Sequence, residues 1–322
     1  MLFIKYHITI FRYTGFFNME YFLVLRQDLF YDDPFKVEIN QEEAEELKHS
    51  FMVLKSALAI AEKYELLISN YLELEQESFK VAANNMVKHS YVFDEYSSNR
   101  QLISRRVANF LTTATMYLDH VPHNLNDIDS TKGLFDGFTT KRKKIHADNF
   151  DYRFCYSLRN YVQHSGLAID SCSVGVRRTS YDNSSHDEYG AKFVFNKSSA
   201  EISKKFKDAL LKEMPESINI IKSCRSYLSC LSELNNHTRQ LIVANISEAK
   251  LSVKKAMLKY NNVIHNESSG LCVFIDSGTH EYTVFTPVYL GIDHLRAKLE
   301  NGHPDLTSLK NSYVSGGDLS PK

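Results

Sequence analysis

The sequence predicts a mainly α-helical protein that carries two small β-hairpin insertions. Glycine and proline are sparse, at 12 and 6 among 322 residues, which favours long helices over a loop-rich β architecture. Residues 42–86 contain neither, and their apolar side chains return every three or four positions, as on one face of a helix. With 43% apolar and 24% charged residues, the chain has the composition of a folded protein and not of a disordered one.

The first two helices are predicted from this periodicity and from proline. From residue 41 we expect one very long helix, or two helices joined by a short break near Tyr64. A second helix is expected over residues 99–121, stopped by Pro122, because proline cannot donate the backbone hydrogen bond of a helix interior. Residues 122–138 contain Asn, Asp, Gly and Pro and are predicted to form a loop.

A third helix is predicted to begin at a Thr139 or Thr140 cap. It should end at Ser165–Gly166, where glycine suits the position just after a helix. Residues 200–262 are expected to be helical again, with a break or a kink at Pro215. These segments together make helix the main secondary structure of the chain.

Strand-forming residues gather in three places. A short strand is expected over residues 20–27, and hairpins are expected within residues 167–197 and 271–292. We therefore expect three consecutive regions: an N-terminal extension with a short strand (residues 1–40), a helical domain (41–240), and a C-terminal helical and β extension (241–322).

The first residues of the chain are apolar and aromatic, but they do not resemble a signal peptide. Lys5, His7 and Arg12 interrupt the apolar core that such a peptide needs. Met19 opens a segment more typical of the start of a soluble protein. We therefore expect residues 1–18 to be an upstream extension, and a peripheral membrane anchor is the alternative.

Cysteine usage and hydropathy indicate a cytoplasmic protein without a membrane partner. The five cysteines are an odd number without a CxxC pair, which favours neither a disulfide framework nor a zinc site and indicates a reducing compartment. No apolar run approaches the roughly 20 residues that a membrane-spanning helix needs. The net charge of −1 excludes a globally basic protein that coats nucleic acid, but it leaves room for a local basic patch.

A candidate active site lies in the third predicted helix, where Arg159 is followed by Asn160 and, five positions after the arginine, by His164. An arginine followed after four to six residues by a histidine is expected about once or twice by chance in such a chain. Arg296 and His303 form a second match, but Asn301–Gly302 breaks the helix before that histidine. The spacing therefore needs support from its context.

A helical wheel supports the match at Arg159. One face forms an apolar core stripe of Phe150, Phe154, Leu158, Tyr161 and Val162. The other forms a polar stripe of Arg142, His146, Asn149, Arg153, Ser157, Asn160 and His164. Asn160 and His164 lie one turn apart and can hydrogen-bond. Arg159 lies at the far edge of the apolar face, so its side chain would have to reach round, or across to a partner copy, to meet His164.

The chemistry that these residue types support is RNA cleavage. The imidazole of His164 can take the proton of a ribose 2′-OH or return one to the leaving 5′-oxygen. The Arg159 guanidinium can hold the scissile phosphate and stabilise charge in the transition state, and the Asn160 amide can orient the imidazole. No metal and no other cofactor is required. One helix supplies one histidine, so separate acid and base need a second copy, as in a two-fold dimer.

The segment "LRNYVQHSG" resembles the signature of the HEPN superfamily of metal-independent ribonucleases, and "NRQLISRRVANFLTTATMYLDH" before it is similar to larger bacterial members. The resemblance covers residues 41–240. It implies an up-and-down helical bundle with Arg159, Asn160 and His164 as catalytic residues. It also implies RNA as substrate and a homodimer whose motifs face each other across the interface. A role as a toxin or an anti-phage effector, with an antitoxin or regulatory partner, follows from the same resemblance.

Basic residues near the start of the third predicted helix are candidates for RNA binding. Lys141 to Lys144 stand at a helix N-terminus, where cations oppose the macrodipole, so a phosphate-binding role would explain them. From this region we single out Arg142, Lys143 and Arg153. Because 18 residues separate His146 from His164, roughly 27 Å along one helix, such a cluster would guide RNA and not join the chemistry. The alternative is a solvated basic turn.

Two functions stay open on the sequence alone. The first is a metal-independent endoribonuclease that yields a 2′,3′-cyclic phosphate and a 5′-OH. The second is a non-catalytic helical module that binds a partner protein or nucleic acid, because polar residues on an amphipathic helix are most often only solvated. In a dimer, the enzyme requires both His164 side chains to line one cleft, whereas the module allows them to point apart.

Overall fold

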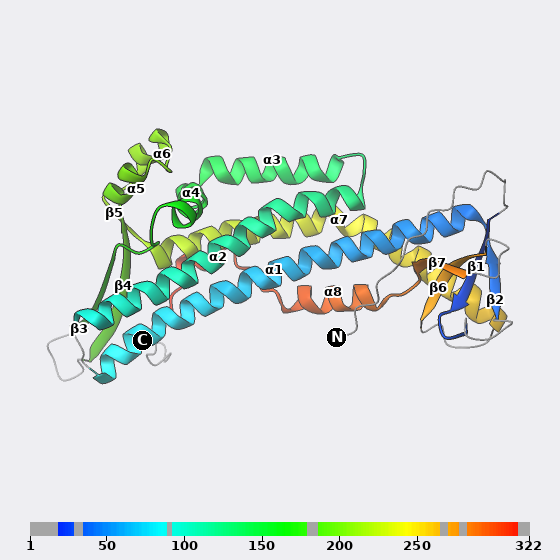
Figure 1. Ribbon diagram of the computed structural model, residues 1–322, viewed down its shortest axis with the longest axis horizontal. Coiled ribbons are helices and arrows are strands. Elements are labelled where there is room, and N and C mark those ends of the chain that lie inside the picture. The colour runs from blue at the N-terminus through cyan, green and yellow to red at the C-terminus, as the bar shows by residue number, and fades with distance from the viewer. Residues whose placement is uncertain are drawn as a thin grey trace. The chain divides into compact units, whose positions relative to one another are not determined.

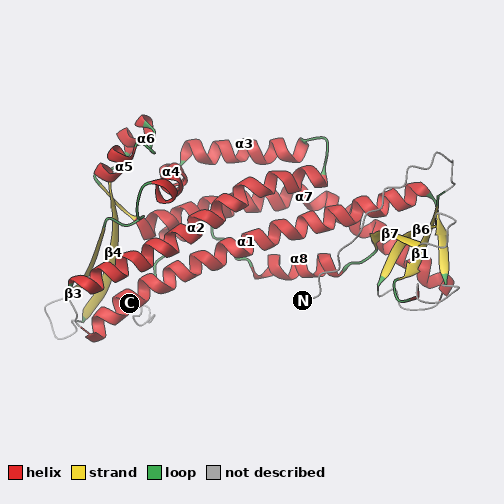
Figure 2. Cartoon of the chain, viewed as in Figure 1, coloured by secondary structure: helices red, strands yellow, loops and turns green. Residues whose placement is uncertain are grey.

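The structure is a computed structural model that describes residues 19–28, 35–88, 92–178, 186–264, 270–276 and 282–314. It is 70% helical, which confirms the mainly α prediction (Figures 1 and 2). The helices are α1 (Gln41–Lys88), α2 (Phe93–Ile128), α3 (Gly133–Asp148), α4 (Phe150–His164), α5 (Lys197–Ser203), α6 (Asp208–Glu213), α7 (Ile220–Ile264) and α8 (Gly291–Gly302). The strands are β1 (Glu20–Leu25), β2 (Lys36–Ile39), β3 (Ser171–Arg178), β4 (Asp187–Asn196), β5 (Ser217–Asn219), β6 (Leu271–Asp276) and β7 (Tyr282–Pro287). The expected upstream extension lies outside the described residues.

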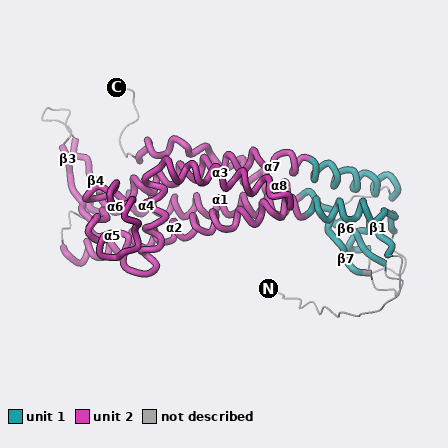
Figure 3. The backbone as a smooth tube through the Cα atoms, turned by 90° about the horizontal axis from the view of Figure 1, so that it is seen from above, with its two compact units in different colours: residues 1–51, 248–290 teal, residues 52–247, 291–322 magenta. Residues whose placement is uncertain are grey.

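The chain forms two compact units, each built from segments that are distant in sequence (Figure 3). Unit 1 comprises residues 1–51 and 248–290, and unit 2 comprises residues 52–247 and 291–322. Both α1 and α7 contribute residues to each unit. This division differs from the three consecutive regions that the sequence suggests.

Unit 1 is built on an antiparallel sheet in the order β2-β1-β6-β7. Strand β1 pairs with β6 from Glu20↔Asp276 to Leu25↔Leu271. The hairpin predicted within residues 271–292 is therefore present, but its strands complete a sheet with the N-terminal strand and do not form a separate insertion. Strand β1 lies inside this sheet with β2 on one edge and β6 on the other, and its Leu23 and Val24 side chains are fully buried.

Helix α1 begins at a reciprocal cap. The Asn40 side chain accepts a hydrogen bond from the Glu43 N–H at 2.8 Å, and the Glu43 carboxylate accepts one from the Asn40 N–H at 3.1 Å. Two backbone donors that would otherwise lack partners at the helix start are thereby satisfied. The helix then continues without interruption through Tyr64, which is buried. Of the two predicted alternatives, the single long helix is correct.

Helix α2 continues past Pro122 to Ile128, so the prediction that Pro122 ends the helix is wrong. Pro122 has no N–H to donate to the carbonyl oxygen of Leu118, four residues earlier, and Leu118 is fully buried. Arg142 of α3 replaces the missing donor, because its Nη1 donates to the Leu118 carbonyl at 3.2 Å. A side chain from another helix thus replaces the missing backbone hydrogen bond.

The predicted third helix is in fact two helices, α3 and α4. Asn149 separates them with extended backbone angles (φ −126°, ψ 116°), and its side chain accepts a hydrogen bond from the Tyr152 N–H at 3.0 Å. Asn149 therefore caps the start of α4 and ends α3. The chain turns between the two helices (Figure 1). The single polar stripe from Arg142 to His164 consequently does not exist, and neither does the 27 Å spacing that it implied.

Two strands follow α4 directly. Strand β3 pairs with β4 from Ser171↔Val194 to Arg178↔Asp187, which confirms the predicted hairpin, and β5 pairs with the base of β4. The side chain of Asp170 accepts a hydrogen bond from the Asn196 N–H at 2.6 Å and closes the base of this β3–β4 ribbon. The helical region predicted over residues 200–262 is interrupted by β5, and Pro215 lies in the break between α6 and β5.

A buried ion pair links α1 to α7 within unit 2. Arg225 donates from Nε and Nη2 to the two carboxylate oxygens of Glu75 at 2.5 and 2.8 Å. The Tyr71 hydroxyl donates to the same carboxylate, and burial together with the Glu75 charge raises the pKa of Tyr71 well above its usual value. Two-point guanidinium–carboxylate geometry fixes the relative rotation of the two helices.

The length and composition of the helices decide whether any of them could cross a membrane. Among the described residues, no helix has both the length and the apolar composition that crossing a bilayer requires. The longest, α1 and α7, carry charged side chains along their entire length.

The hydrogen bond from Arg142 to Leu118 leads to a testable prediction. Arg142→Ala should lower the free energy of unfolding by about 1–3 kcal/mol, because a buried carbonyl loses its partner. Urea denaturation followed by circular dichroism measures this loss. Lys143→Ala, a change at an exposed neighbour, should stay within about 0.5 kcal/mol of the wild type.

The variant Pro122→Ala provides a control for the hydrogen bond between Arg142 and Leu118. It restores an N–H that can bond to Leu118, so Arg142→Ala should cost less in a Pro122→Ala background than in the wild type. An equal cost in both backgrounds would show that the guanidinium does not replace the missing backbone donor.

Candidate functional site

Aromatic packing fixes the orientation of α4. Phe154 and Tyr161 are buried on its inner face and pack against Phe195 of β4 and Phe206, with ring centroids 5.1 to 6.1 Å apart. The predicted core stripe is therefore largely confirmed: Phe154, Leu158 and Tyr161 are buried. With this face held inward, the opposite face of the helix is left available to solvent.

The three candidate catalytic residues differ in exposure along α4, and they do not form one connected set. Arg159 donates from Nη1 to Oδ1 of Asn160 at 3.2 Å, and both side chains are half-buried. His164 is the last residue of the helix and is exposed. In the described part of the chain, no hydrogen bond joins His164 to Asn160, although their spacing allows one. Arg159, predicted to lie off the stripe of Asn160 and His164, donates to Asn160, and no hydrogen bond joins it to His164 among the described residues.

Arg159 retains binding capacity. Its Nε is buried and has no hydrogen-bond partner among the described residues. A buried Nε is closed to a ligand from solvent, so an oxyanion such as a phosphate has to be held by the terminal nitrogens of the guanidinium. The His164 imidazole is exposed and can donate or accept a proton. The site can therefore supply an anion clamp and a proton carrier from one helix.

Two of the three predicted RNA-binding residues have structural partners. Arg153 donates to the carbonyl oxygens of His146 and Ala147, at 3.0 Å to His146, and forms an ion pair with Glu213 of α6. Arg142 donates to the Leu118 carbonyl that Pro122 leaves without a backbone partner in α2. Lys143 is exposed. Arg153 thus holds the end of α3 against α4 and α6, and Lys143 has the fewest constraints of the three.

Lys207, which sequence reasoning missed, joins the basic residues at the α3–α4 junction. Burial lowers the pKa of His146, and the charges of Arg153, Lys207 and Arg142 lower it further. Arg142 also lies near Tyr152, where burial raises the phenol pKa to about 12 although the guanidinium opposes the rise. Lys207 comes from the loop between α5 and α6, so no local pattern pointed to it.

The second Arg–His match, Arg296 and His303, is a structural network. His303 is buried, with Nε2 2.8 Å from a carboxylate oxygen of Glu65 and Nδ1 2.9 Å from Nη2 of Arg239. Because arginine can only donate, Nδ1 accepts and Nε2 carries the proton, so His303 is neutral. Arg296 is paired with acidic residues of its own helix. Neither side chain faces solvent as His164 does.

The described residues contain no group of three His, Cys, Asp or Glu side chains arranged to hold a metal ion. All five cysteines are free thiols. Burial raises the pKa of Cys172 to about 11 and that of Cys230 to about 12, so both thiols are protonated and weakly nucleophilic at neutral pH.

Comparisons of the chain with models of protein families, with curated proteins and with solved structures found no match. The mainly α fold is established by the structure itself. The HEPN resemblance and the bundle that it implies stay predictions, and the function is inferred from the geometry of α4 and its surroundings.

Gly166, just after α4, leads to a second prediction. The sequence favoured glycine there for conformational freedom, but the only positive φ among the described glycines is at Gly270. A Cβ at Gly166 would instead lie 2.6 Å from the Tyr161 hydroxyl. Gly166→Ala should therefore destabilise the protein by about 1–3 kcal/mol, measured by urea denaturation, because the buried ring has to move.

Gly175→Ala is the matched control, since a Cβ there meets nothing within 4 Å. Tyr161→Phe, which removes the hydroxyl, should reduce the loss of stability that Gly166→Ala causes. An equal loss of stability with and without the hydroxyl would refute close approach as the reason for this glycine.

Proposed function

We propose that the protein is a metal-independent endoribonuclease of the HEPN type. The observation that carries the proposal is the arrangement on α4, where the half-buried Arg159 and Asn160 are hydrogen-bonded and His164 is exposed at the helix end. The aromatic face of the same helix is buried, so these polar groups sit on a rigid element, as a catalytic site requires.

In the proposed reaction, a ribose 2′-OH attacks the adjacent phosphorus and the 5′-oxygen leaves. His164 transfers a proton to or from these oxygens. Arg159 holds the non-bridging phosphate oxygens through its terminal guanidinium nitrogens and stabilises the charge that develops on them. Asn160 positions the guanidinium through their hydrogen bond. The products are a 2′,3′-cyclic phosphate and a 5′-OH.

A homodimer completes the proposal. Each chain offers one histidine in the motif, and a two-fold axis would bring two His164 side chains and two Arg159 side chains to one RNA strand. One histidine then acts as base and the other as acid. A toxin or anti-phage role, an antitoxin or regulatory partner and a cytoplasmic location belong to the same proposal and rest on the HEPN resemblance.

One observation favours the alternative, a non-catalytic module that binds a partner protein. Leu72, Phe79 and Met86 are exposed on α1 at intervals of seven residues. Apolar residues repeated at this interval are typical of a helix that pairs with another helix. This surface can serve a partner whether or not the protein cleaves RNA, so only an activity measurement separates the two functions.

The test is cleavage of a mixed-sequence RNA by the wild type and by single variants. Arg159→Ala and His164→Ala should each reduce the rate at least about a hundredfold, because each removes a group used in the transition state. Gln163→Ala, an exposed neighbour on the same helix, should cleave like the wild type. A chelator should leave the wild-type rate unchanged.

Two outcomes would overturn the proposal. Unchanged cleavage by both variants would place any ribonuclease activity elsewhere or in a contaminant. Loss of cleavage in the presence of chelator would move the chemistry to a metal site that includes residues outside the motif.

A further inference from the structure

Three lysines surround one buried phenylalanine in the loop that joins α5 to α6. This lysine loop consists of Lys204, Lys205, Phe206 and Lys207. Phe206 is only 5% exposed, whereas all three lysines are exposed. A single aromatic anchor therefore fixes a loop whose other side chains carry three positive charges into solvent.

Ring contacts place the lysine loop beside the motif helix. The Phe206 ring centroid lies 6.0 Å from that of Phe154 and 6.1 Å from that of Tyr161, both on α4, and 5.7 Å from that of Phe195 on β4. Helix α6, which follows the loop, lies next to α4 (Figures 1 and 3). Tyr161 precedes His164 by three residues, about 4.5 Å along the helix axis. The loop is thus anchored close to the end of α4 that carries His164.

An ion pair shows on which side of α4 this neighbouring element lies. Arg153 of α4 is paired with Glu213 of α6. At about 100° per residue, Asn160 and His164 project from α4 within about 20° of the direction of Arg153. The side of α4 that faces α6 is therefore also the side that carries two of the three motif residues.

The positive charge of the loop is not neutralised by the carboxylates that follow it. Glu213 is paired with Arg153, and Glu216 is paired with Lys197. Within the described ranges, no ion pair includes any of the three loop lysines. Burial lowers the pKa of His146 on α3, and nearby cations, with Lys207 among them, lower it further. Positive charge therefore prevails around the loop.

The backbone of Lys204 is a further sign that its side chain is used. Its φ of 53° lies in the left-handed region, which glycine or asparagine usually occupies after a helix. Glycine at this position would relieve the strain, but it would also remove one of the three charges.

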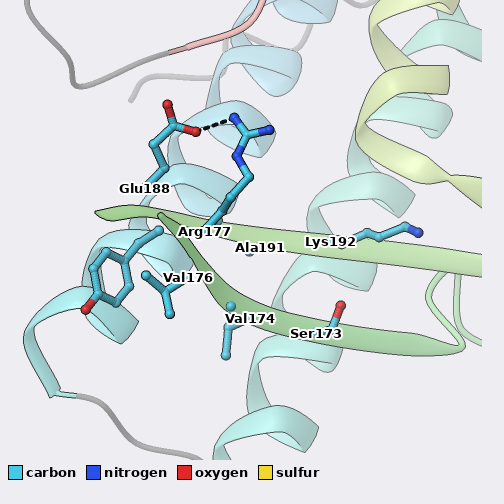
Figure 4. A pocket seen from close by; sticks show the side chains of 10 residues that line it. Ser173, Val174, Val176, Arg177, Glu188, Ala191 and Lys192 are labelled. Atoms are coloured by element: carbon cyan, nitrogen blue, oxygen red, sulfur yellow. Dashed lines mark hydrogen bonds and ion pairs between the residues drawn. The ribbon is translucent and has the colours of Figure 1, made fainter. Parts of the chain in front are cut away.

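The neighbouring β3–β4 ribbon is less suited to an anion. A concavity of about 630 Å³ follows it, and Figure 4 shows Arg177 paired with Glu188 there. Lys192 is the remaining cation among the residues that line this concavity. The ribbon therefore supplies a control position, and the cluster of positive charge lies on the lysine loop.

We propose that Lys204, Lys205 and Lys207 hold the phosphate backbone of single-stranded RNA and guide it along α4 to His164. The inference rests on the proposed ribonuclease function and assigns the surface that takes its substrate. An ammonium group binds phosphate as a point charge, so exposed lysines on a fixed loop hold the backbone without reading the bases. This surface differs from the basic turn indicated by the sequence, because Arg142 and Arg153 bond within the protein.

Binding of a labelled oligonucleotide tests the lysine loop without requiring cleavage. The probe is a mixed-sequence 2′-O-methyl RNA of about twelve nucleotides, which keeps its phosphates but lacks the 2′-OH nucleophile, so the full-length wild type can be used. Fluorescence anisotropy at several salt concentrations gives the slope of log affinity against log salt. Replacing the three loop lysines together by glutamine should make this slope less steep by about 2, since each phosphate contact on a single strand contributes about 0.7. Affinity at about 0.1 M salt should fall about 10-fold to 100-fold.

Two matched variants separate the position of the charge from the net charge. Lys192→Gln, Lys254→Gln and Lys255→Gln together remove the same charge from exposed positions elsewhere and should keep the wild-type slope. Replacing the three loop lysines by arginine keeps the charge and should also keep the slope. All three variants should melt near the wild-type temperature, because every replaced side chain is exposed.

An equal change of slope in the control variant, or no binding by the wild type, would overturn the proposal. An unchanged slope in the glutamine variant would overturn it as well and would leave an acidic partner protein as the alternative ligand of the loop. A wild type that shows the lysine-dependent slope but cleaves no normal RNA would instead overturn the proposed ribonuclease and leave the RNA-binding loop standing.

Discussion

The hydrogen bond from Arg142 to the carbonyl of Leu118 is the interaction on which the position of the candidate site depends. Pro122 removes one backbone donor near the C-terminal end of α2, and a buried carbonyl without a partner would end or bend that helix. Arg142 satisfies the carbonyl and thereby ties α3 to α2. Since Asn149 connects α3 to α4 through a single capped junction, the start of the motif helix is set by the same contact.

From this junction, aromatic packing determines which face of α4 meets solvent. Phe154 and Tyr161 are held by rings from β4 and from the segment before α6, which leaves Arg159 and Asn160 half-buried and His164 exposed. Unpaired buried polar atoms occur on several helices of the described chain, and the Arg159 Nε on the motif helix is one of them.

The parts of this arrangement that follow local rules could be predicted from the sequence. Periodic apolar residues predicted α1 and the buried side of α4, and alternating residues predicted the β3–β4 ribbon. What could not be predicted depends on contacts between distant residues. Pro122 is tolerated only because Arg142 is available from another helix, and β1 finds its partner at the far end of the chain. Asn149 could have been recognised as a helix cap, but the regular spacing on either side of it favoured one continuous helix.

The central claim is that RNA is cleaved through its own 2′-OH at the outer face of α4. The most direct measurement is the chemistry of the product ends, with a substrate that carries a single 2′-deoxy nucleotide at a mapped cleavage position. We predict a 2′,3′-cyclic phosphate and a 5′-OH on the normal RNA, and no cleavage at the 2′-deoxy position. A 3′-OH with a 5′-phosphate, or cleavage that persists at the 2′-deoxy position, would contradict the account.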